Sequence, residues 1–197
     1  DPKYLGKMHD VHGPWSYLGV EEHYKFFNSI DPLFHSEFGS EGAANLSAID
    51  KIVSKKHVWP PDRTNKIWRH HGNWWICKDK IDGIFGKIKD IKTFVKTSQF
   101  IQAEGLRYCI ESNRRRKWRC SGAMPWQFNE SWPNLACTNS VDYYGVPRPA
   151  YWWIRNSYEQ LHVSVKYDKL FWPDGKFNCD VWVNNAGYGL LDAVATM

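Results

Sequence analysis

The stretch Phe34-His35-Ser36-Glu37-Phe38-Gly39 is the most informative part of this chain. It places the carboxylate of Glu37 at the end of a short apolar run, among aromatic and histidine side chains. Gly39, two residues later, allows the backbone to turn sharply away. Barrels of alternating strands and helices carry their functional side chains at the C-terminal ends of the strands. Glu37 is therefore a candidate catalytic carboxylate, and geometry alone leaves a buried structural acid equally open.

Three further motifs accompany this stretch in a fixed order. Residues 9–15 read HDVHGPW, residues 121–133 read SGAMPWQFNESWP and residues 141–145 read VDYYG. Together they resemble the C-terminal part of the catalytic domain of the family 2 glycoside hydrolases, with the β-mannosidase-like branch the most similar. A single D-x-H-x-W or S-E-F-G match would carry little weight, but several motifs in one order are specific. The resemblance runs from about Asp10 to Leu161.

The resemblance implies a retaining mechanism in which Glu37 is the nucleophile. Glu37 would form a covalent glycosyl-enzyme, while a second carboxylic acid about 5 to 5.5 Å away protonates the leaving oxygen and then activates water. In the family this acid follows an Asn well before the nucleophile. None of the acids among the 36 residues before Glu37 follows an Asn. Glu130 does follow Asn129, but it lies after the nucleophile, so we assign it no acid/base role and expect the acid outside this chain.

The same resemblance supplies four candidate substrate-binding residues. His12 and Trp15 match the D-x-H-x-W motif that lines the sugar pocket, with Asp10 as a residue that orients them. Trp126 matches a tryptophan at the floor of the sugar subsite, and a core tryptophan is the alternative. Asn129 would either bond sugar hydroxyls or cap its loop.

The hydrophobic pattern predicts an α/β fold. Short strands are expected at residues 4–12 and 33–37, separated by the aromatic-rich segment 17–30, and a helix is expected at 42–54. Residues 59–80 read as a loop crowded with Trp and His. A helix should begin near Ser98 as its N-cap and end near Arg115, followed by a strand at 121–128 and a helix at 149–161. Glu41 would be a solvated acid at a helix N-terminus. Alternating strands and helices with motifs at strand ends are typical of a (β/α)8 TIM barrel.

The period of the pattern changes to two after this region. Residues 162–167 and 178–183 alternate, and the turn Pro173-Asp174-Gly175 between them predicts paired strands. A complete barrel usually needs about 250 residues, whereas this chain has 197. We therefore expect a partial TIM barrel over residues 1–161 and the truncated start of an immunoglobulin-like β-sandwich over residues 162–197.

Composition narrows the function classes. Twelve Trp suit either a core or the flat faces of sugar rings. The net charge of +5 has one dense run, residues 114–119, at the end of a helical pattern without a recognisable nucleic-acid module. Five scattered Cys and the pairs His9/His12 and His70/His71 form no convincing metal-ligand pattern, although His70 or His71 could face the substrate. No apolar stretch approaches the roughly 20 residues of a membrane helix.

The sequence thus predicts a fragment of a retaining exo-glycosidase that acts on terminal β-linked sugars. A β-mannoside is favoured, with a β-galactoside or β-glucuronide as alternatives, and a non-catalytic carbohydrate-binding module is the competing interpretation. We expect no cofactor, metal, nucleic acid or membrane partner. The expected partners are the carbohydrate and the remainder of the parent enzyme, for which a periplasmic, secreted or lysosomal location would be suitable. The fragment alone should be inactive and, because half a barrel leaves sheet edges unpaired, should self-associate or rearrange.

Overall fold

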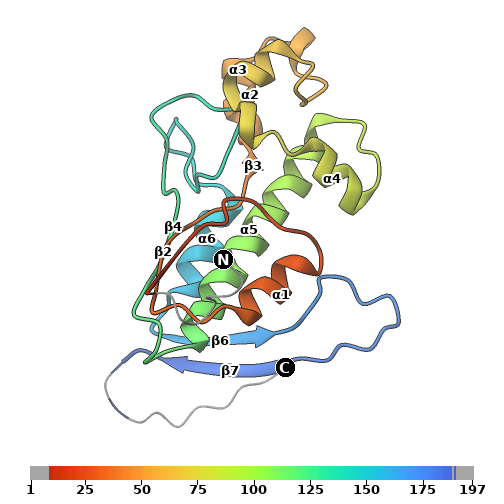
Figure 1. Ribbon diagram of the computed structural model, residues 1–197. Helices are drawn as coiled ribbons and strands as arrows, with labels where there is room; N and C mark the ends of the chain where they lie inside the picture. Colours follow the sequence, from red (N-terminus) through yellow and green to blue (C-terminus); the bar gives the residue numbers. More distant parts are fainter. Residues whose placement is uncertain (1–8, 188, 190–197) are drawn as a thin grey trace.

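The computed structural model describes residues 9–187 and residue 189 (Figure 1). The elements, with η marking a 3-10 helix, are β1 (Asp10–His12), α1 (Glu22–Ser29), β2 (Phe34–Phe38), β3 (Gly42–Ala43), α2 (Leu46–Ile52), η2 (Lys55–His57), α3 (Lys66–Gly72), η3 (Asn73–Trp75), α4 (Lys78–Phe85), α5 (Ile91–Arg115), β4 (Ala123–Pro125), β5 (Ala136–Cys137), α6 (Pro149–Ser157), β6 (Leu161–Lys166) and β7 (Asp180–Asn185).

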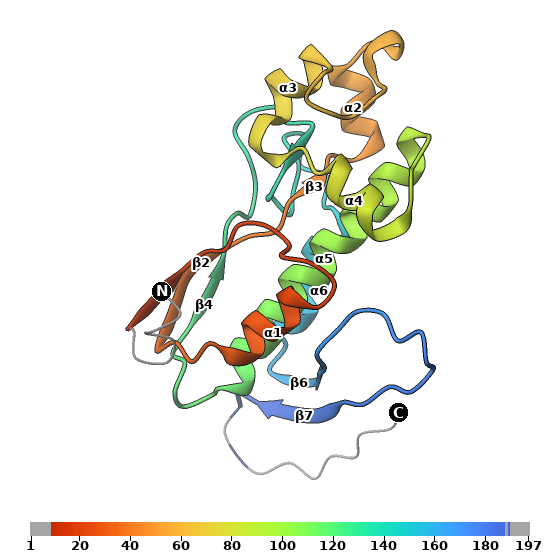
Figure 2. The same cartoon turned by 45° about the vertical axis from the view of Figure 1, so that its right-hand side comes forward.

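A three-stranded parallel sheet carries the motifs. Its order is β1-β2-β4, with helix α1 connecting β1 to β2 and the segment α2 to α5 connecting β2 to β4. Parallel neighbours need such crossover connections. Figure 2 shows the chain leaving β2 and β4 toward the end of the molecule that α2 and α3 occupy. The motifs at the ends of the three strands therefore lie together at that end.

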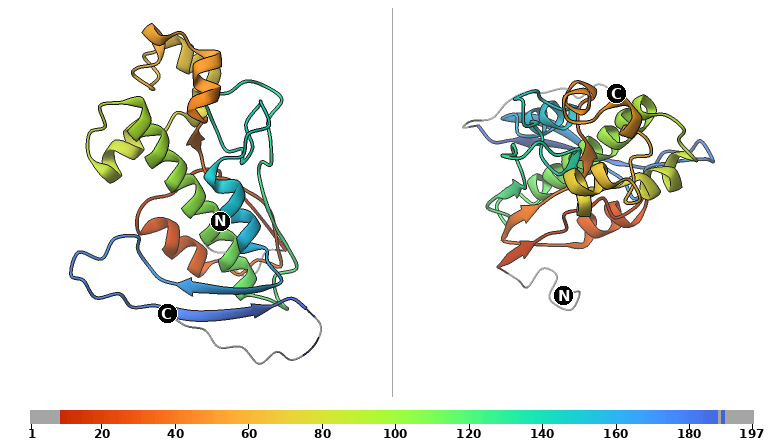
Figure 3. Two further views of the ribbon diagram at one scale, coloured as in Figure 1. Left: turned by 180° about the vertical axis from the view of Figure 1, so that it is seen from behind. Right: turned by 90° about the horizontal axis from the view of Figure 1, so that it is seen from above.

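Helix α5 is the centre of the packing. The shorter helix α6 lies beside part of it, and α1 packs against it toward the end of the molecule where β6 and β7 lie (Figures 1 and 3). Fully buried apolar side chains from these helices and from β2 form the core, among them Phe27, Phe38 and Leu106. Burial of each such side chain contributes about 1.5 to 3 kcal/mol. Among the residues described, no helix combines the length and apolar character needed to cross a membrane.

The predicted start of this helix at Ser98 is wrong. Helix α5 begins at Ile91, and Asp90 is its N-cap, accepting a hydrogen bond from the backbone N–H of Thr93 at 2.9 Å. Ser98 is instead a buried residue in the middle of the helix, and its hydroxyl oxygen accepts from the N–H of Ala43 at 3.2 Å. Polar residues on the buried face conceal the helical period, so the sequence pattern underestimates the length of this helix.

The interpretation of residues 59–80 as a loop is also wrong, because α3, η3 and the start of α4 lie there. Asn65 caps α3 by accepting from the N–H of Ile67 at 3.1 Å. Only Trp68 and Gly72 of α3 are buried. Trp68 donates its indole N–H to the carbonyl of Val58 at 3.0 Å. Segment 17–30 likewise contains helix α1, where only an aromatic-rich connection was expected. Of the strand expected at 121–128, only the three residues of β4 are extended into a strand. The helix expected at 149–161 is α6, which ends earlier, at Ser157.

The predicted strand pair near the C-terminus is present. Strands β6 and β7 are antiparallel, with Leu161 opposite Asn185 and Lys166 opposite Asp180. Gly175, at φ +69°, donates its N–H to the carbonyl of Trp172 in the connecting turn. A hairpin of two strands is marginal on its own. This one is attached to α5 by a polar network.

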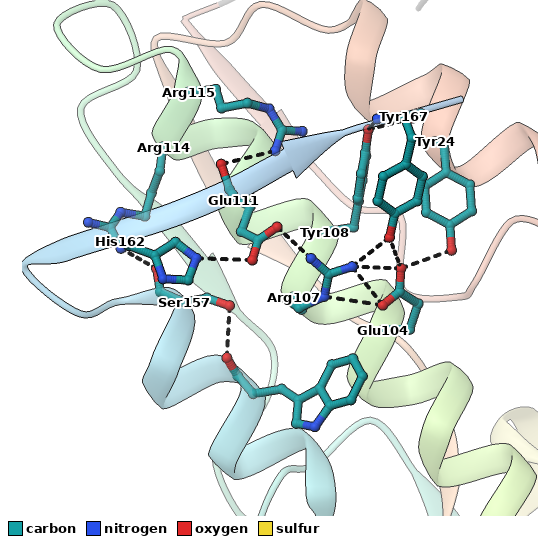
Figure 4. Close-up of polar contacts among 12 residues, drawn as sticks. Tyr24, Glu104, Arg107, Tyr108, Glu111, Arg114, Arg115, Ser157, His162 and Tyr167 are labelled. Carbon is teal, nitrogen blue, oxygen red and sulfur yellow. Dashed lines mark hydrogen bonds and ion pairs between the residues drawn. The ribbon is translucent and has the colours of Figure 1, made fainter. Parts of the chain in front are cut away.

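Figure 4 shows this network. The guanidinium of Arg107 on α5 donates to the carboxylates of Glu104, at 2.7 Å, and Glu111, at 2.6 Å. His162 on β6 contacts Glu111 at 3.0 Å, and Arg107 also donates to the hydroxyl of Tyr167 at 2.6 Å. Both carboxylates are almost fully buried. The hairpin therefore lies against α5 through side chains that neutralise one another.

Candidate active site

Glu37 is the second-to-last residue of β2, and the Glu37 side chain is 26% exposed. Its neighbours His35 and Phe38 point into the core and are fully buried. In the pairing of β1 with β2, His12 lies opposite Glu37. The strand thus anchors Glu37 through buried neighbours and presents its carboxylate at the sheet end.

Two of the predicted binding residues contact this carboxylate. Trp15 donates its indole N–H to Oε1 of Glu37 at 2.9 Å. Nε2 of His12 lies 3.3 Å from Oε2, and the His12 and Trp15 rings meet edge to face with centroids 5.1 Å apart. Hydrogen bonds to a charged acceptor are stronger than neutral ones and hold its orientation. Trp15 therefore fixes one carboxylate oxygen of Glu37 by a hydrogen bond, and His12 lies beside the other.

The loop after β1 is fastened to the backbone of β2. Gly13 donates its N–H to the carbonyl of Glu37 at 2.6 Å, and Gly39 donates to the carbonyl of Pro14 at 2.8 Å. A Cβ atom on Gly39 would lie 2.8 Å from the carbonyl oxygen of Trp126, which is too close for any other residue. Gly39 is thus required by close approach of two strands rather than by its backbone angles.

His35 positions the same loop, a role that its local sequence does not indicate. Burial lowers the pKa of His35, so the ring is neutral at pH 7. Nδ1 accepts from the amide of Asn113 at 3.1 Å, which leaves Nε2–H to donate to the carbonyl of Gly13 at 2.8 Å. The histidine adjacent to the strand-end acid in the motif is therefore an internal support.

Asp10 orients His12 through Ser36. Ser36 donates its N–H and its hydroxyl to the Asp10 carboxylate at 3.0 and 2.7 Å, and its hydroxyl oxygen lies 3.0 Å from Nδ1 of His12. Desolvation opposes the charge of Asp10, but the hydrogen bonds from Ser36 outweigh it and lower the pKa of this carboxyl. The chain Asp10–Ser36–His12 thus ends at Glu37.

The other two predicted residues lie farther along the sheet end. Trp126 follows β4, donates its N–H to the carbonyl of Phe38 at 2.6 Å, and is joined to Gln127 by a cis peptide bond. Its ring is half-buried against Trp75, with centroids 5.7 Å apart. Asn129 is exposed, and among the described residues no hydrogen bond connects it to Glu37. The geometry therefore brings His12, Trp15 and the backbone of Trp126 to the Glu37 strand end, while the role of Asn129 stays a prediction.

The expectation that Glu41 is a solvated helix-terminal acid is wrong. Glu41 is 6% exposed and accepts from the hydroxyl of Ser16 at 2.9 Å and the N–H of Tyr17 at 3.1 Å. Lys80 on α4 forms an ion pair with it. These contacts hold the segment that follows Trp15. Because Lys80 is distant in sequence, only the tertiary structure reveals this pair.

Glu130 is also occupied inside the protein. It is 8% exposed, accepts from the amide of Asn134 at 2.8 Å and lies 3.8 Å from the buried guanidinium of Arg148. Burial raises the pKa of Glu130 despite this guanidinium. These contacts attach Glu130 to the interior of its own loop.

Replacing Trp15 by phenylalanine tests the hydrogen bond to Glu37. The variant keeps an aromatic ring but loses the indole donor, a loss of about 1.5 to 3 kcal/mol for a bond to a charged group. If Glu37 is the nucleophile that the family resemblance implies, kcat/KM for β-glycoside hydrolysis by the full-length protein should fall by about tenfold or more. Unchanged kinetics with unchanged thermal stability would show that this bond does not orient the Glu37 carboxylate.

A second buried histidine gives a pH-dependent prediction. Burial lowers the pKa of His23 to about 3, and its ring is stacked on Tyr17 with centroids 4.6 Å apart. The unfolded chain binds this proton below its ordinary pKa of about 6.5, whereas the folded chain does not. The contribution of neutral His23 to the free energy of unfolding is therefore fully present above pH 6.5 and is lost as the pH falls toward 3. Urea unfolding of wild type should show a loss of about 2 kcal/mol between pH 7 and pH 5 from this group. His23→Gln should show a shallower dependence, and equal slopes would contradict the prediction.

Among the described residues, no group of three or more His, Cys, Asp or Glu side chains could hold a metal ion. The His70/His71 pair is instead engaged with Trp132 and Pro133.

No family model matches the sequence. The curated β-mannosidase B of Aspergillus niger is 29% identical over 195 residues, covering 91% of this chain, and that of Aspergillus terreus is 28% identical over the same length. The crystal structure of a β-D-mannosidase from Dictyoglomus thermophilum superposes with a TM-score of 0.73 at 25% identity over 90% of this chain. Over most of its length this chain resembles β-mannosidases of glycoside hydrolase family 2.

The likeness extends beyond β-mannosidases at the level of the fold. An exo-chitosanase from Amycolatopsis orientalis matches with a TM-score of 0.65 at 21% identity over 79% of this chain. The chain spans about a fifth of the length of its relatives: 22% of each of the two fungal proteins and 21% of the Dictyoglomus enzyme. The resemblance to family 2 glycoside hydrolases that the motifs indicated is thereby confirmed.

Proposed function

We propose that the protein containing this chain is a retaining exo-glycosidase with Glu37 as its nucleophile, acting on terminal β-mannosides. The observation that carries the proposal is the placement of Glu37 at the end of a parallel strand, with its carboxylate held by Trp15 and His12. This is where a barrel enzyme carries its catalytic groups. The relatives named β-mannosidase favour mannose over galactose or glucuronic acid.

The proposed reaction proceeds in two displacements. A carboxylate oxygen of Glu37 attacks the anomeric carbon and the glycosidic C–O bond breaks, while a second acid gives its proton to the leaving oxygen. Water then attacks the same carbon, gives a proton to that second residue and releases Glu37. Trp15 and His12 orient the nucleophile throughout, and Trp126 lines the sugar subsite. We place the second acid in a part of the enzyme outside these residues.

The same proposal assigns the architecture. Residues 1–161 would be the last part of a TIM barrel, in which β1, β2 and β4 are adjacent strands, and residues 162–197 would begin a β-sandwich. Within the described residues both β1 and β4 are sheet edges, as an interrupted barrel requires. The 197 residues alone should show little turnover, because loss of the acid/base typically forfeits a factor of about 10² to 10⁴.

A panel of aryl β-glycosides tests the sugar assignment. The full-length protein should hydrolyse the β-mannoside selectively over the β-galactoside and β-glucuronide. Selective cleavage of another sugar would replace the mannose assignment and keep the mechanism. Sugar binding without cleavage of any member would favour the alternative, a non-catalytic carbohydrate-binding module.

A further inference from the structure

A stacked pair of rings lies on the surface between α3 and the loop that follows Trp126. The imidazole of His71 and the indole of Trp132 have centroids 5.6 Å apart and planes within 18° of parallel. Trp132 is nevertheless 49% exposed. Among the exposed tryptophans in the described residues, it is the only one stacked nearly parallel on another ring. His71 lies over one face of the indole, and His70 meets the indole edge to face with centroids 5.8 Å apart, so the exposed surface of Trp132 is what these two rings leave uncovered.

The two rings are fixed by their surroundings. Nδ1–H of His71 donates to the carbonyl of Pro133 at 2.8 Å, and the N–H of Leu135 donates to the carbonyl of His71 at 2.7 Å. The following residue, Asn134, donates its amide to the buried carboxylate of Glu130 at 2.8 Å. Hydrogen bonds therefore fix the chain segments before and after Trp132. A rigid aromatic surface loses little conformational entropy when a ligand binds to it.

The segment formed by α3 and η3 connects this pair to the strand end that carries Glu37. Trp126 is bonded through its N–H to the carbonyl of Phe38, the residue after Glu37. The Trp126 ring contacts Trp75 with centroids 5.7 Å apart. Trp75 is the last residue of η3, which follows α3 directly, and His71 in α3 stacks on Trp132. Trp132 therefore packs on the same α3–η3 segment as Trp126, whose backbone is bonded to the end of β2.

We propose that Trp132, backed by His71, is the platform for the sugar on the leaving-group side of the scissile bond. Such a platform selects β-linked oligosaccharides of neutral hexoses, because the C–H faces of these rings match a flat, uncharged aromatic surface. The inference rests on the proposed function and adds a second sugar subsite to it. Trp132 contacts no reacting atom in this account, so it affects which glycoside is bound rather than the cleavage chemistry.

Two substrates distinguish binding of the leaving-group sugar by Trp132 from a general structural role of this residue. The glycone of β-mannosyl fluoride is followed by a single fluorine atom, whereas β-1,4-mannobiose places a second sugar on the leaving-group side. In the full-length protein, Trp132→Ala should lower kcat/KM for mannobiose by about tenfold, the upper range for loss of one aromatic stacking partner. The same variant should hydrolyse the fluoride within about twofold of wild type. Trp152→Ala removes an equally exposed tryptophan, 48%, from α6 and should leave both substrates unaffected.

The fluoride also reports whether the variant is folded. Equal losses on both substrates would show that Trp132 supports the site structurally, and no loss on mannobiose would show that it binds no sugar; either result overturns the inference alone. If the wild-type protein hydrolysed neither substrate, the proposed function and this inference would both be wrong.

Discussion

Replacing Glu37 by glutamine should lower kcat/KM of the full-length protein on aryl β-mannosides by about 10⁴-fold or more, as for other enzymatic nucleophiles. The amide preserves shape and can still accept the indole N–H of Trp15, but it cannot form the glycosyl ester. Steady-state kinetics of the purified variant measure the effect. The matched control is Glu22→Gln, an exposed acid in the first turn of α1, which should retain wild-type rates. Hydrolysis by Glu37→Gln within tenfold of wild type would contradict the nucleophile assignment.

Azide should restore turnover to the Glu37→Gly variant. The missing side chain leaves space for a small anion, which would attack the anomeric carbon from the face that Glu37 otherwise occupies. The product is then α-mannosyl azide, with inverted configuration. A β-mannosyl azide would instead identify Glu37 as the acid/base residue.

The second large effect concerns stability. Arg107→Met should lower the free energy of unfolding by about 3 to 5 kcal/mol, because it leaves the buried carboxylates of Glu104 and Glu111 without their cation. Burial opposes the charge on Arg107, but these two carboxylates outweigh it and raise its pKa. Urea unfolding followed by tryptophan fluorescence measures the change.

A triple variant distinguishes pairing from side-chain packing. Arg107→Met combined with Glu104→Gln and Glu111→Gln removes all three charges and should recover much of the lost stability, since the uncompensated charge causes most of the cost. The triple variant could instead be less stable than Arg107→Met, by the sum of the losses that Glu104→Gln and Glu111→Gln cause singly. The network in Figure 4 would then stabilise the fold through packing rather than through charge.

Local pattern was sufficient for the elements whose neighbours are close in sequence. The alternation in residues 162–167 and 178–183 predicted β6 and β7 because each strand buries few side chains and pairs with the strand next to it in the sequence. Glu37 was placed at a strand end because the apolar run and Gly39 are local signals. The sequence also predicted that His12 and Trp15 belong beside Glu37, through the family motif rather than through spacing.

The features that were missed depend on distant partners. Helix α5 buries Ser98, Gln99 and Gln102, whose polar atoms are bonded to β3, Asn45 and the carbonyls of residues 137 and 139, so its buried face does not read as apolar. Glu41 was expected in solvent because its cation comes from α4. The supporting role of His35 depends on Gly13 and Asn113, which no local window contains.

The most direct test of the central claim is covalent trapping of the nucleophile. The full-length protein, incubated with 2-deoxy-2-fluoro-β-mannosyl fluoride, should accumulate a glycosyl-enzyme, because the 2-fluoro group slows its hydrolysis more than its formation. After proteolysis, mass spectrometry should find the added fluorosugar on the peptide that contains FHSEFG, at Glu37. Labelling at another carboxylate would contradict the account.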